Sequence, residues 1–121
     1  MSYIPPLTLS TAPFRLTSSI DGVNASLVKA SSGTLFGAVC YNTSSLPRYI
    51  KFYNKATAPT VGTDVPMASY YINPQDSFDI PLPAPMLFST GISVAFTSFS
   101  SDSDSTAIGA GEIMGLNVYF Q

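Results

Sequence analysis

Carboxylates in two closely spaced pairs are the residues of this 121-residue chain best suited to chemistry. Asp76 and Asp79, three positions apart, point to opposite faces of a regular strand, so they are poorly placed to act together as acid and base. Asp102 and Asp104 alternate with serines, and oxygen ligands of this kind can coordinate calcium, but the twelve-residue EF-hand pattern is missing. We expect a solvated loop there, with a calcium site as the alternative.

Nucleophilic and zinc-assisted catalysis lack their usual side chains. The chain contains no histidine, which removes Ser-His-Asp and Cys-His catalysis in their common forms and the commonest zinc ligand. Cys40 is the only cysteine and lies in an apolar run, which is typical of a buried, unreactive thiol. The sequence therefore predicts that the protein is not an enzyme. We expect no catalytic, cofactor-binding or metal-ligating residue in it.

Charge is scarce throughout the chain. Only 10% of the residues are charged, against about 25% in typical soluble domains, while 45% are apolar. A surface with few charges has little electrostatic protection against association, which suits a protein whose faces are covered by partners. The net charge is −2, and the only clustered cations are Arg48, Lys51 and Lys55, too few for a nucleic-acid footprint.

Membrane and export signals are also missing from the pattern. No apolar run approaches the roughly 18 residues of a membrane span. No cationic, apolar leader opens the sequence. We expect no contact with membrane or nucleic acid, and synthesis in a cytoplasm.

Residues 1–13 are predicted to form an extended arm ahead of the folded domain. They contain three prolines and four serines or threonines, and the Pro5-Pro6 pair favours a polyproline-like backbone. We expect this arm to lie across a neighbouring subunit. Its candidate contact residues are Tyr3, Ile4, Pro5, Pro6 and Leu7.

Short apolar runs separated by proline, glycine and polar turns indicate strands in residues 14–121. Residues 34–41 are almost continuously apolar, which is typical of a central strand covered on both faces. A turn at residues 42–45 is predicted to join this strand to residues 48–53 as a hairpin. Further strands are predicted at residues 14–20, 25–30, 67–72, 77–82, 86–88, 91–99 and 113–121.

No segment has a convincing helical apolar period, and glycine, proline, serine and threonine are too frequent for a long helix. Short strands at regular spacing favour a β-sandwich or a jelly roll. The sequence predicts an all-β, single-domain antiparallel β-sandwich or jelly roll that follows an extended N-terminal arm.

Residues 48–53 also supply a candidate protein interface. Ile50 and Phe52 face one way, while Tyr49 and Tyr53 flank Lys51 on the opposite, nominally exposed face. Tyrosine offers apolar area and a hydroxyl group, and it is common at interfaces. The predicted interface residues are therefore Arg48, Tyr49, Lys51 and Tyr53, although alternating aromatics more often belong to a sheet core.

Three segments resemble a module of small β-rich structural proteins of tailed bacteriophages. Residues 41–66 read Y-N-T-S-S-L-P-R-Y-I-K-F-Y-N-K-A-T-A-P-T-V-G-T-D-V-P, which matches the family's N-T-S turn, its R-Y-aliphatic-K strand and its Y-N-K-A loop. Residues 88–92 are similar to the family's F-S-T-G-aliphatic step, and residues 102–107 to its loop rich in Asp and Thr. The resemblance spans residues 35–110, and the arm does not match.

The resemblance implies a virion component. The first expectation is a capsid decoration, or cement, protein that binds the major capsid protein on the outside of the assembled head and stabilises the shell. It would act as a homo-oligomer, with a trimer expected. The alternative is a tail, baseplate or fibre-associated protein, including a receptor-binding module.

Overall fold

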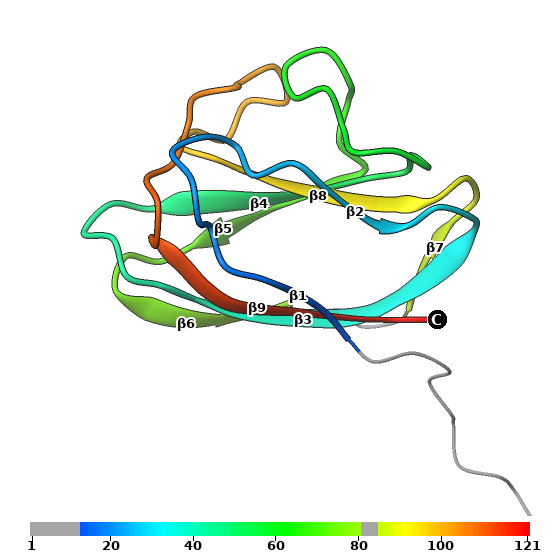
Figure 1. The fold of residues 1–121 in the computed structure, drawn as a ribbon, viewed down its shortest axis with the longest axis horizontal. Coiled ribbons are helices and arrows are strands. Elements are labelled where there is room, and N and C mark those ends of the chain that lie inside the picture. Colours follow the sequence, from blue (N-terminus) through cyan, green and yellow to red (C-terminus); the bar gives the residue numbers. More distant parts are fainter. Residues whose placement is uncertain (1–12, 81–84) are drawn as a thin grey trace, which may run out of the picture.

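A computed structural model describes residues 13–80 and 85–121, which form two antiparallel sheets packed face to face (Figure 1). The five-stranded sheet contains, from one edge, β1 (Phe14–Leu16), β9 (Ile113–Phe120) and β3 (Gly33–Asn42), followed by β6 (Asp76–Asp79) and β7 (Met86–Phe88), which both pair with β3. The four-stranded sheet contains β2 (Ser26–Lys29), β8 (Ile92–Thr97), β4 (Arg48–Tyr53) and β5 (Ala68–Ile72), in that order.

The strand order is that of a jelly roll. Strands β1 to β4 alternate between the two sheets, and β8 and β9 return to insert between earlier strands of each sheet. Every named strand pair is antiparallel. The predicted all-β sandwich is therefore confirmed, and of the two predicted architectures the strand order selects the jelly roll.

One apolar core lies between the sheets. In β9, Leu116, Val118 and Phe120 point inward, as the period-two pattern predicts. All six residues of β8 are buried, because this strand lies between β2 and β4 and both of its faces are covered. Burying this apolar surface is the main force that holds the sheets together.

The predicted hairpin between residues 34–41 and 48–53 is wrong. Strand β3 pairs with β6, β7 and β9, whereas β4 lies in the other sheet and pairs with β5 and β8. The Asn42 side chain accepts a hydrogen bond from the Ser44 amide (2.9 Å) and donates one to the Leu46 carbonyl (2.9 Å). These local bonds and the following proline form a wider arch that carries the chain across the sandwich instead of back along β3.

A third layer of chain covers the outer face of the four-stranded sheet. The segments 54–66 and 98–112 run over β4 and β8 (Figure 1), and Gly62 of the first lies beside Ser103 and Ser105 of the second. Among the described residues, no comparable layer covers the outer face of the five-stranded sheet. No helix in these residues is long and apolar enough to cross a lipid bilayer.

Candidate protein-binding surfaces

The interface residues predicted on β4 are mostly covered by the protein's own chain. Lys51 and Tyr53 lie outside the core cluster, yet they are 0% and 1% exposed. The segments 54–66 and 98–112 run over β4, the strand that carries both residues (Figure 1). Arg48 is also buried, and only Tyr49 stays partly accessible. The expectation that this face meets solvent is therefore wrong for Lys51 and Tyr53, since a period-two pattern does not show that a loop will fold back over a strand.

Lys51 organises the covering loop. Its ammonium group donates hydrogen bonds to the backbone carbonyls of Ser101 (2.5 Å) and Asp104 (3.4 Å). The Asp104 carboxylate in turn accepts bonds from the Phe99 amide (3.1 Å) and the Thr106 hydroxyl (2.6 Å). Burial lowers the pKa of Lys51, and the nearby Asp104 and Asp102 carboxylates partly oppose that effect.

These contacts bear on the alternative calcium site at Asp102 and Asp104. Loop carbonyls that could coordinate a cation already accept hydrogen bonds from Lys51. Within residues 13–80 and 85–121, no group of three or more metal-ligating side chains comes together. The loop that carries Asp102 and Asp104 is thus organised around the Lys51 ammonium group.

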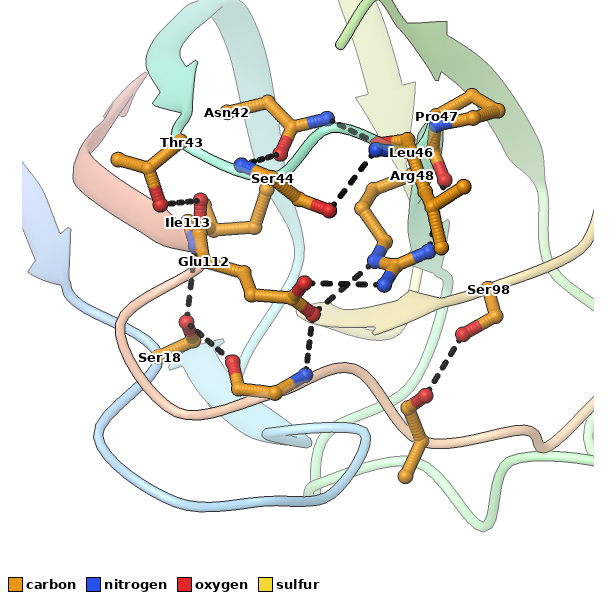
Figure 2. Close-up of polar contacts among 12 residues, drawn as sticks. Ser18, Asn42, Thr43, Ser44, Leu46, Pro47, Arg48, Ser98, Glu112 and Ile113 are labelled. Atoms are coloured by element: carbon orange, nitrogen blue, oxygen red, sulfur yellow. Dashed lines mark hydrogen bonds and ion pairs between the residues drawn. The ribbon is translucent and has the colours of Figure 1, made fainter. Parts of the chain in front are cut away.

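Arg48 forms the main ion pair between the two sheets. Its Nε and Nη2 atoms donate to the two carboxylate oxygens of Glu112 at 3.1 and 3.0 Å, and the side chains are only 10% and 21% exposed (Figure 2). Glu112 also accepts a bond from the Gly109 amide. Burial alone would raise the pKa of Glu112, but the bonds from Arg48 and Gly109 outweigh it and lower the pKa. Arg48 is thus a structural residue that joins β4 to the segment before β9.

The five-stranded sheet presents an apolar outer face that no other segment of the described chain covers. Tyr41 lies opposite Met114, and Gly37 lies opposite Tyr119, so these side-chain positions share the outward face. Tyr41, Met114 and Tyr119 are 44%, 49% and 36% exposed. Arg15 and Asp79, at opposite edges, are the charged residues at its outward strand positions.

A shallow groove of about 580 Å³ runs along this face. Its lining includes Val39, Tyr41, Met114 and Gly115, together with Asp79 of the edge strand β6. A β-bulge gives β9 one extra residue between the Val39–Asn117 and Tyr41–Met114 pairs, and Gly115 adopts a φ of +63° there, a conformation that glycine accommodates without strain. We name the outward face formed by β1, β9, β3 and β6 the flat face.

A second surface combines the exposed Leu46, Tyr71 and Phe99 with the partly accessible Tyr49, and we name it the aromatic patch. The Tyr49 and Tyr71 rings meet edge to face with centroids 5.5 Å apart. Leu46, Tyr49 and Phe99 line a pocket of about 230 Å³. Tyr49 is the predicted interface residue that this patch retains.

The remaining sequence predictions concern residues that lie in neither of these two surfaces. The arm residues Tyr3, Ile4, Pro5, Pro6 and Leu7 lie outside the described residues. Cys40 is buried as expected, and burial raises the pKa of its thiol to about 12.

The sequence did carry a signal for the flat face, because the run at residues 34–41 is apolar on both sides. That pattern predicts cover on both faces, and the described chain covers only the inner one.

Comparisons with protein-family models, with curated proteins and with solved structures gave no match to this chain.

Proposed function

We propose that this chain is a structural protein of a tailed-bacteriophage virion, and most specifically a decoration protein that binds the outside of the assembled head shell. The flat face is the observation that carries the proposal. It is broad, contains exposed Tyr41, Met114 and Tyr119, and has charges only at its two edges. Docking such a face removes apolar surface from water while leaving few charged groups to be desolvated.

The resemblance of residues 41–66 to phage structural modules supplies the phage part of the proposal. A jelly roll is consistent with it, since viral capsid domains often have this fold. The same fold also carries unrelated functions, so the fold by itself is not the argument. The support comes from the combination of an uncovered apolar face with those sequence motifs.

The mechanism of stabilisation would be mass action. A protein that binds the assembled shell but not its free subunits shifts the equilibrium toward the shell, by about 2.7 kcal/mol at a free concentration of 100 times the Kd. Repetition of one modest contact over the lattice would add avidity, particularly if the protein is an oligomer. The predicted contacts of the arm residues 3–7 would extend this interface.

The location and copy number of the protein in purified particles test the proposal. Labelled antibody in cryo-electron microscopy would show the location, and quantitative mass spectrometry against the major capsid protein would give the copy number. A decoration protein is expected on the head surface in hundreds of copies. A few copies at the tail would support the alternative of a tail, baseplate or fibre-associated protein, and absence from the particle would refute both.

A further inference from the structure

The edges of the two sheets differ in how well they are protected from pairing with another chain. Edge strands usually avoid such pairing through charges, short length or bulges. Strand β1 has three residues and carries Arg15, and β2 has a register shift and ends at Lys29. Strand β6 has aspartate at both ends, and β7 has only three residues.

Strand β5 has none of these protections. It runs for five uncharged residues, Ala68–Ile72, without proline or glycine, and pairs with β4 in unbroken register. Within residues 13–80 and 85–121, the four-stranded sheet ends at β5 on this side. Its outer main-chain groups therefore form a regular, neutral template for another strand.

Apolar side chains gather around the same edge. Tyr71 within β5 is 48% exposed, and Met67, just before it, is 45% exposed. Tyr71 also belongs to the aromatic patch, in which its ring contacts Tyr49. An added strand would thus gain side-chain contacts as well as main-chain hydrogen bonds.

We propose that β5 is the contact through which two copies of this chain associate, with the two β5 strands antiparallel across a two-fold axis. A two-fold contact pairs the same strand with itself, so any charge on that strand would face its own kind. Strand β5 contains no charge, whereas β6 would bring Asp76 and Asp79 near their copies. The charge pattern therefore favours self-pairing at β5.

Pairing at β5 joins the two four-stranded sheets into one continuous sheet of eight strands and brings the two aromatic patches to one interface. It needs no phage shell, so it can hold or fail independently of the proposed function. It also differs from the trimer that the phage resemblance implies, because the contact is two-fold.

Sedimentation velocity of the full chain over a range of concentrations tests the proposal. We expect a reversible equilibrium between one and two chains. The variant Ser69→Glu places a charge within the paired strands, and because Ser69 is exposed in the single chain, the change should preserve the fold. We expect Ser69→Glu to shift the midpoint of association to at least a tenfold higher concentration.

The matched control is Ser31→Glu, an exposed residue in the turn after β2, at the far edge of the same sheet. It should associate like the wild type. A wild-type protein that stays a single chain, forms a trimer, or dimerises equally well as Ser69→Glu would overturn the proposal.

Hydrogen exchange of the wild-type protein gives a second readout that does not depend on any variant. Amides of residues 68–72 should exchange more slowly at concentrations where two chains associate than at high dilution. Protection that does not change with concentration would show that another part of the chain, and not a second copy, covers this edge.

Discussion

Two buried polar residues show what single side chains contribute to this fold. Arg48 and Lys51 both belong to β4, yet Arg48 pairs with a carboxylate and Lys51 with main-chain carbonyls. Arg48 and Lys51 each fix a loop to β4. Their charges therefore serve the monomer's own structure and leave the outer faces poor in charge.

Replacement of Glu112 by glutamine should destabilise the protein and reduce its sensitivity to acid. The pKa of Glu112 is lowered in the fold, so the unfolded chain binds the proton more readily and stability is lost as the pH falls below the ordinary value of 4.5 and through the folded pKa. We expect Glu112→Gln to cost about 1–3 kcal/mol at neutral pH, because Arg48 loses its charged partner. Urea unfolding at neutral pH and at about pH 3.5 measures both effects.

The difference in unfolding free energy between wild type and Glu112→Gln should shrink at the lower pH. A constant difference at both pH values would show that the ion pair with Arg48 is not responsible for it.

Tyr53 should tolerate loss of its hydroxyl group. Among the described residues, the Tyr53 hydroxyl is buried without a hydrogen-bond partner. Burial, together with the charges of Asp64 and Asp102, raises its pKa to about 12. Because an unpaired buried hydroxyl is costly, Tyr53→Phe should be at least as stable as the wild type at neutral pH.

The alkaline range gives the Tyr53 prediction its sharper test. Above about pH 10 the unfolded tyrosine loses its proton while the folded one keeps it, so wild-type stability falls toward pH 12. Tyr53→Phe lacks this contribution, and its advantage over the wild type should grow across that range in thermal unfolding. A variant that is less stable than the wild type at neutral pH would contradict this account.

At the scale of elements, the sequence predicted which segments are strands better than it predicted which strands pair. The predicted strands at residues 48–53 and 86–88 are β4 and β7 themselves, and the other seven predicted strands have counterparts shifted or shortened at their ends, such as β1, which stops at Leu16. Alternation of apolar residues specifies the buried side of each strand. It does not specify which sheet the next strand joins, and the Asn42 side chain decides that locally by shaping the arch.

The covering loop over β4 could not be predicted for the same reason. Lys51 at an alternate position indicates a solvent-facing strand, and only the folded chain shows Ser101 and Asp104 above it. The uncovered flat face was not predicted, because the apolar run at residues 34–41 indicates a strand covered on both faces. The bulge at Gly115, a residue that lines the groove, left no distinct signal in the sequence.

Replacement of Lys51 by methionine should loosen the loop at residues 98–107 more than the sheet beneath it. Methionine retains the apolar stem, but the carbonyls of Ser101 and Asp104 lose their charged donor. Faster hydrogen exchange is expected in the loop, with little change in β8. Ser100→Glu, which adds a charge on the exposed surface of the same loop, is the control. Equal exchange in Lys51→Met and wild type would contradict an organising role for Lys51.

At the scale of the whole molecule, the two sides of the sandwich are unequal. One sheet is covered by the protein's own loops, and in the described residues the other presents the flat face. A chain with 10% charged residues and an uncovered apolar face is suited to a permanent place in a larger assembly. That asymmetry is the physical basis of the proposed attachment to a head shell.

Co-sedimentation of the purified protein with phage heads that lack it tests this attachment most directly. Gly37 lies in the flat face opposite Tyr119, and no atom stands within 4 Å of where its side chain would begin, so Gly37→Glu adds a charge without crowding the sheet. The control Ser100→Glu carries the same charge on the opposite side of the molecule. We predict that wild type and Ser100→Glu bind the heads while Gly37→Glu, folded by circular dichroism, binds at least tenfold more weakly. Equal binding by all three proteins, or binding by none, would contradict the account.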